Sequence, residues 1–157
     1  MAQEAQRVEE VSTTVGRPAW QSGVIGGLAG GLVMGILFSV MMPAVIENAI
    51  PALVGLSGGI AGWFVHMSIS AVFGVGFAAL VTRSEIPARW RSYRGMVSLG
   101  LVYGIGLWVI AAGIVMPVWL GAVGFPNPPP LPNLTLPSLL LHLVFGAILG
   151  AVYQYLR

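Results

Sequence analysis

The sequence contains no cysteine and no lysine, and only 8% of its 157 residues are charged. Without cysteine the chain cannot form disulfides, iron–sulfur clusters, cysteine zinc sites or thiolate nucleophiles. An average soluble domain has about 25% charged residues, so this composition excludes an ordinary water-soluble protein. Serine–histidine–acid sets, paired carboxylates and phosphate-binding glycine loops are also missing. We therefore expect no catalytic residues and no enzymatic activity.

Apolar residues make up 57% of the chain and gather in four long runs, at about residues 23–46, 59–82, 95–122 and 138–156. Each run is long enough for a membrane-spanning helix, which needs about 20 apolar residues. The runs are continuously apolar, whereas the strands of a membrane barrel alternate in short segments. The sequence therefore predicts an all-α membrane protein, with a polar cytoplasmic tail over residues 1–22 and a single four-helix domain over residues 23–157.

The arginines predict the orientation of the spans. With four spans, all seven arginines fall on one side, and the connections on the other side, 47–58 and 123–137, carry only Glu47. Positively charged loops stay in the cytoplasm, so we expect a multi-pass protein of the plasma (inner) membrane with both termini cytoplasmic. We expect anionic lipid headgroups, and not nucleic acid, to be the partners of the arginines near the second connection: Arg83, Arg89, Arg91 and Arg94.

The positions of the aromatic residues predict the membrane interfaces. The inner interface is predicted at Trp20, Trp90, Tyr93, Tyr153 and Tyr155, and the outer interface at Trp63 and Trp119, with Trp108 as a mid-span packing residue. Residues 124–137 include six prolines. This composition predicts a stiff, extended spacer without hydrogen bonds to its neighbours.

A weak internal repeat relates residues 23–82 to residues 95–156. A shift of 74 positions places Met42 on Met116, and a shift of 76 positions places His66 on His142. Because each half contains two spans, both halves begin on the same side of the membrane. The sequence therefore predicts two helical hairpins arranged as parallel repeats.

Small residues recur every fourth position along the spans, and such seams let helix backbones approach closely in a membrane. The predicted helix-packing residues are Gly23, Gly27, Gly31, Gly35, Gly62, Ser70, Gly74, Gly100, Gly104, Gly146 and Gly150. We expect them to pack the four helices together. In the alternative interpretation, the long seam of the first span binds a helix of another protein.

The only histidines, His66 and His142, share a repeat position, and at 1.5 Å per residue they lie about 10 and 7 Å inside the predicted outer boundary. The simplest interpretation gives each ring one hydrogen bond that joins helices and needs no cofactor. The alternatives are haem b ligated by both rings or a chlorophyll-type pigment ligated by one, a metal held by Glu47, His66 and His142, and a proton relay.

Several short motifs resemble a family of small, uncharacterised four-span membrane proteins of bacteria and archaea, loosely YagU-like. They are the sequence GWFVH at residues 62–66, Arg94-Gly95, Met116-Pro117 and the sequence HLVFGAILG at residues 142–150. The resemblance covers most of residues 23–156 and implies a four-span fold, but no activity or cofactor. We therefore predict a non-enzymatic subunit of a larger membrane complex, such as a respiratory or photosynthetic one. An electron-transfer protein ligated by His66 and His142 is the alternative, and a small-solute transporter is the third.

Overall fold

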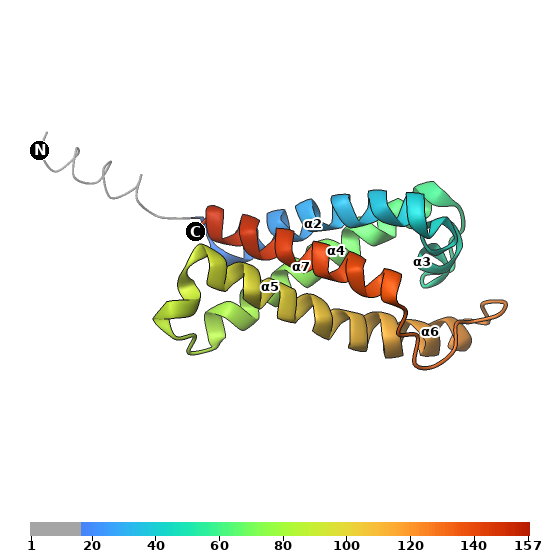
Figure 1. The fold of residues 1–157 in the computed structure, drawn as a ribbon. Coiled ribbons are helices and arrows are strands. Elements are labelled where there is room, and N and C mark those ends of the chain that lie inside the picture. The colour runs from blue at the N-terminus through green and yellow to red at the C-terminus, as the bar shows by residue number, and fades with distance from the viewer. Residues whose placement is uncertain (1–16) are drawn as a thin grey trace, which may run out of the picture.

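In a computed structural model, the chain folds into a bundle of long helices joined by short connections (Figure 1). The structure describes residues 17–157, so most of the predicted polar tail lies outside the described residues. The spans are α2 (Ala19–Met41), α4 (Gly59–Arg83), a composite helix over Tyr93–Ala122, and α7 (Leu136–Tyr155). All four are long and apolar enough to cross a membrane, which confirms the predicted all-α, four-helix fold.

The first span begins and ends earlier than predicted. α2 starts at Ala19, so residues 19–22 belong to the helix and not to the tail. It ends at Met41, before the predicted boundary at residue 46, because Pro43 disfavours a helical conformation in the preceding residue; Met42 has φ −142° and ψ 55°. The chain continues as the π-helix η1 (Val45–Ala49) and the single turn α3 (Ile50–Ala52).

The third span changes its winding halfway along. It consists of α5 (Tyr93–Leu107), the π-helix η3 (Trp108–Val115) and α6 (Met116–Ala122). Pro117 lacks the N–H that would bond the carbonyl of Gly113 in an α-helix. That carbonyl instead accepts a hydrogen bond from the backbone N–H of Asn133, at 2.9 Å.

The proline-rich connection is therefore attached to the bundle. Besides the hydrogen bond from Asn133, a Cβ at Gly113 would come within 2.6 Å of Leu134 Cδ2, so the leucine side chain lies on the glycine. The prediction that this segment makes no hydrogen bonds to its neighbours was wrong, because Pro117 leaves a free carbonyl for it to bond.

The helices pack most closely in the pairs α2–α4, α5–α7 and α2–α7. Gly23 and Gly27 contact the backbone of α4, whereas Gly26 and Gly30 contact α7 from the neighbouring face of the same helix. The structure places every predicted packing residue in a contact within the bundle. Because α4 covers the long seam of α2, that seam has no free face for a helix of another protein.

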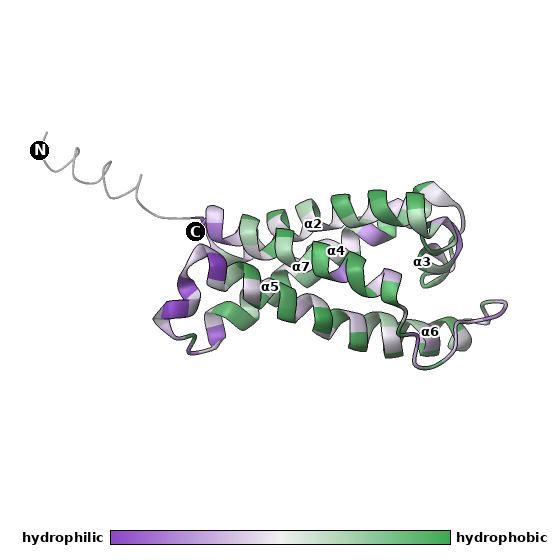
Figure 2. Ribbon diagram, in the orientation of Figure 1, coloured by the Kyte–Doolittle hydropathy of each residue, from purple (hydrophilic) through white to green (hydrophobic). Residues whose placement is uncertain are grey.

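Both ends of the described chain lie at one end of the bundle, together with connection 84–92 (Figure 1). We call this the arginine end, because all arginines except Arg7, which lies outside the described residues, flank the helices there. Figure 2 shows the same end as the largest hydrophilic region of the described chain. Arg157 Nη1 donates to the carbonyl of Arg17 at 3.2 Å, which ties the two chain ends together. The described chain thus ends at the same end of the bundle at which it begins.

Two of the predicted interface aromatics lie in or against the core instead. Tyr153 is 2% exposed and meets Phe77 of α4 edge to face, with ring centroids 5.4 Å apart. Trp63 is half-buried and packs over Gly35. Hydropathy indicates the depth of a residue but not which side of its helix faces the neighbouring helices, and here the faces of Tyr153 and Trp63 are turned inward. Trp119, in contrast, is 53% exposed, and its indole N–H donates to the carbonyl of Leu53 at 2.8 Å.

Candidate functional site

His66 is fixed between two helices. It lies on the buried face of α4, and its Nε2 donates to the carbonyl of Gly31 on α2 at 2.8 Å. Phe38 and Trp63 meet the ring edge to face, at centroid distances of 5.7 and 6.2 Å. Ser70 donates to the carbonyl of His66 at 2.8 Å. This imidazole therefore holds α4 against α2, as the simplest interpretation of the sequence expects.

His142 is equally buried but makes a different hydrogen bond. Its Nδ1 donates to the carbonyl of Ser138, one turn earlier in α7, at 2.7 Å. Helical side chains lean toward the N-terminus of their helix, so the ring points away from the arginine end. The bond lies within one helix, and His142 does not link α7 to a neighbour through its ring. The expectation of a helix-joining histidine thus holds for His66 and fails for His142.

A glycine explains how two histidines at one repeat position come to differ. A Cβ at Gly35 would lie 3.1 Å from His66 Cδ2, so the His66 ring uses the space that this glycine leaves. The contacts of Gly27 with α4 match those of Gly100 with α7, a shift of 73 positions, so the counterpart of Gly35 in the second half is Trp108. Because tryptophan carries the Cβ that glycine lacks, the second half does not offer its histidine the same recess.

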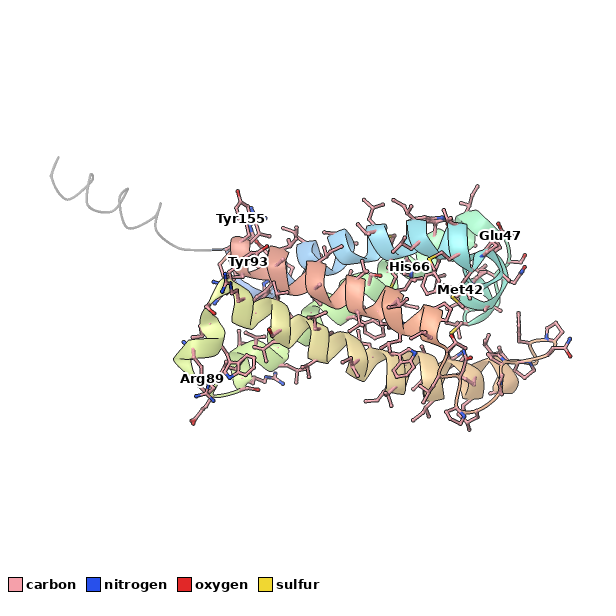
Figure 3. All side chains as sticks on the ribbon, viewed as in Figure 1. Met42, Glu47, His66, Arg89, Tyr93 and Tyr155 are labelled. Atoms are coloured by element: carbon pink, nitrogen blue, oxygen red, sulfur yellow. The ribbon has the colours of Figure 1, made fainter. Side chains whose placement is uncertain are left out.

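The structure does not assemble the predicted metal site. Glu47 is exposed in η1, with its Cγ beside Gly59 at the end of the bundle opposite the arginines. Figure 3 shows Glu47 and Met42 near that end, with His66 in the same half of the bundle, far from Arg89 and Tyr155. Within residues 17–157, no three His, Cys, Asp or Glu side chains gather into a group that could hold a metal ion.

The two rings as they stand also do not fit a haem between them. His66 Nε2 is engaged by Gly31, and the free nitrogen, Nδ1, lies next to the Cβ, where a flat macrocycle cannot approach without a clash. The edges of Phe38 and Trp63 enclose the same ring. Ligation by both histidines would require His66 to give up its bond to α2.

Two buried polar atoms to which the sequence assigned no functional role lack a hydrogen-bond partner among the described residues. They are Trp108 Nε1, in the middle of the third span, and Ser22 Oγ, near the arginine end of α2. Tryptophan usually lies at a membrane interface, where its N–H finds a partner. The mid-span position of Trp108 was the available signal, because the packing role predicted from the sequence leaves the N–H of this residue without a partner.

Comparisons of the chain with known protein families, with curated proteins and with solved structures found no match. The resemblance to YagU-like proteins therefore stays a prediction, and functional conclusions come from the geometry of this chain.

Proposed function

We propose that the protein is a non-enzymatic integral membrane subunit that contributes a rigid four-helix unit to a larger membrane complex. The observation that supports this role is the uneven burial of the spans. In the most apolar stretch of the third span, Tyr93–Ala122, 17% of residues are buried, against 33–44% in the other three. Most residues of this span are therefore exposed on the outside of the bundle, where a neighbouring protein can contact them.

Two glycines on that span add to this support. Gly106 in α5 and Gly121 in α6 have no neighbouring atoms within 4 Å of the position of a Cβ. The other helical glycines of the spans contact the chain itself. Glycine on an open helix face lets another backbone approach closely, which is how helices associate in a membrane.

The proposed location is the plasma (inner) membrane, with the arginine end in the cytoplasm. Positively charged connections are retained on that side, and the connection at the opposite end that contains Glu47 carries no arginine. Arg83, Arg89, Arg91 and Arg94 are all exposed, so anionic headgroups are their proposed partners. Each such arginine contributes about 1 kcal/mol to binding an anionic surface.

Site-specific photo-crosslinking in native membranes tests the subunit role. A benzophenone side chain at Ile110, which is 59% exposed in η3, should crosslink to one integral membrane protein. The same group at Val72, which is 66% exposed on α4, is the matched control and should give lipid adducts only. Gly106→Leu should reduce recovery of the crosslinked partner in a mild-detergent extract without unfolding the chain.

Two outcomes would contradict the proposal. One is a chain that purifies without any stoichiometric partner and crosslinks only to lipid from both positions. The other is an isolated chain that carries the absorbance band of a haem or chlorophyll, which would favour the electron-transfer alternative.

A further inference from the structure

Two polar atoms in the second hairpin have complementary chemistry and no partner. Trp108 Nε1 is a buried donor without a hydrogen bond. His142 uses its Nδ1–H on the carbonyl of Ser138, and in a neutral imidazole the other nitrogen, Nε2, then carries a lone pair. No hydrogen bond of residues 17–157 reaches that lone pair. An unpaired donor is costly in an apolar interior, so a group that both accepts and donates would satisfy Trp108 Nε1 and use the lone pair of His142 Nε2.

The packing of α5 on α7 places these atoms in one layer of the bundle. Gly100 lies against the carbonyl of Gly146, and Gly104 lies against the carbonyl of His142, so the two antiparallel helices are in register at these pairs. One turn further from the arginine end, Trp108 is level with Ser138. Ser138 is the residue whose carbonyl holds the His142 ring. Side chains lean toward the N-terminus of their own helix, so these antiparallel helices direct Trp108 and His142 into the same layer.

The backbone at this layer is also unusual. The π-helix η3 begins at Trp108, and π-helical turns occur frequently at functional sites. Ligating or substrate-binding histidines commonly donate their other N–H to a backbone carbonyl, which fixes the tautomer and the ring orientation. The bond from His142 to Ser138 has this form, and it leaves Nε2 available. The Nε2 of His66 is not available in this way, because it donates to the carbonyl of Gly31, and Phe38 and Trp63 enclose the ring.

The surroundings restrict the ligand to a neutral molecule. The described arginines flank the helices at one end, and Glu47 is exposed at the other. The buried polar side chains are serines and histidines, and the rest of the buried core is apolar. His142 lies six residues, or about 9 Å, from the first residue of α7. This depth is within the hydrocarbon of a bilayer.

We propose that Trp108 and His142 bind the hydroxyl group of a neutral, membrane-soluble molecule, either a quinol or an isoprenoid alcohol. The hydroxyl oxygen accepts from Trp108 Nε1–H, and its O–H donates to His142 Nε2. A ketone or ether oxygen also accepts from Trp108, but it has no proton for His142 and leaves two acceptors facing each other. The site therefore distinguishes a quinol from its quinone. This binding role does not depend on the proposed subunit role.

Titration of the full chain in detergent micelles tests the proposal, with the ¹H–¹⁵N signal of each indole as the readout. The probes are a short-chain benzoquinol under anaerobic conditions, its quinone, its dimethyl ether, and the isoprenoid alcohol farnesol. The quinol or farnesol should shift the Trp108 signal downfield. The hydroxyl probe should bind about tenfold more tightly than the dimethyl ether or the quinone, because each of these loses one hydrogen bond to a buried group.

Variants assign the effect to the two residues. Trp108→Phe and His142→Leu should each lower affinity for the hydroxyl probe by about tenfold. Trp119→Phe should leave it unchanged, because that indole already bonds to Leu53 away from this layer. If farnesol binds more tightly than the quinol, the hydroxyl belongs to a lipid alcohol, and the reverse order assigns it to a quinol. Both results support the site.

The proposal is overturned if the dimethyl ether binds as tightly as the quinol, or if neither hydroxyl probe moves the Trp108 signal. The second result would mean that only water reaches this layer. Both readouts use the unmodified chain, so they remain decisive even where Trp108→Phe or His142→Leu fails to fold.

Discussion

Gly100 and Gly146 meet backbone to backbone, so that a Cβ added to either would overlap the carbonyl oxygen of the other. Gly23 and Gly74 are related in the same way in the first hairpin. Each hairpin thus depends on a pair of glycines in mutual contact, and the distance between its two helices is set by the absence of side chains.

Gly146→Leu should separate α5 from α7 and lower the free energy of unfolding. Overpacking of a tight core typically costs about 1–3 kcal/mol, and backbone atoms on the facing helix cannot rotate away. Gly106→Leu is the control, because nothing lies within 4 Å of its Cβ position. Unfolding in mixed micelles, followed by circular dichroism, measures both. Equal stability of the two variants would contradict the close approach of these helices.

His66→Ala should destabilise the fold more than His142→Ala does. His66 bonds across to α2 and packs against Phe38 and Trp63, whereas His142 bonds only within α7. His66→Ala removes an inter-helical hydrogen bond, which is worth about 0.6 kcal/mol on average in membrane proteins. It also removes the packing of the imidazole against Phe38 and Trp63. The same micelle assay tests the order, and a larger loss for His142→Ala would show that its ring does join helices.

Tyr103→Phe should loosen the contact between the hairpins. The Tyr103 hydroxyl donates to the carbonyl of Phe73 at 2.8 Å and thereby links α5 to α4, which are not among the closely packed pairs. We expect a loss of about 0.5–1.5 kcal/mol. The matched control is Tyr93→Phe, since Tyr93 is 58% exposed. An unchanged stability for Tyr103→Phe would mean that this bond does not hold the hairpins together.

Asn133→Pro should detach the proline-rich connection from η3, because proline has no N–H to donate to the carbonyl of Gly113. Asn133→Ala keeps the N–H and should behave like the natural chain. Limited proteolysis of this connection in micelles reports the difference, with faster cleavage expected in the proline variant. If both variants are cleaved at the same rate, the hydrogen bond does not secure the connection.

The absence of cysteine makes the orientation directly measurable. Ser57 and Ser84 are exposed in connections at opposite ends of the bundle. In intact cells a membrane-impermeant maleimide should label Ser57→Cys, whereas Ser84→Cys should react only after the membrane is permeabilised. Labelling of both in intact cells would show that α4 does not cross the membrane, and the reverse pattern would invert the orientation.

The primary structure was sufficient to locate the four spans, because an apolar run of membrane-spanning length needs no tertiary contact to be recognised. The alternation of arginine-rich and arginine-poor connections likewise follows from the order of residues alone. The recurrence of small residues also marked the faces on which helices meet. These properties are local, and hydropathy, charge and spacing report them directly.

The pairing of those faces depended on the folded chain. Gly26 and Gly30 lie beside Gly27 and Gly31 in the sequence, yet they contact α7 and not α4, and no spacing rule states which helix occupies which face. Nor could spacing show that His66 bonds across to α2 while His142 bonds within its own helix. Hydrogen-bond direction depends on the space left by residues far away in the chain, and that space exists only once the helices have packed.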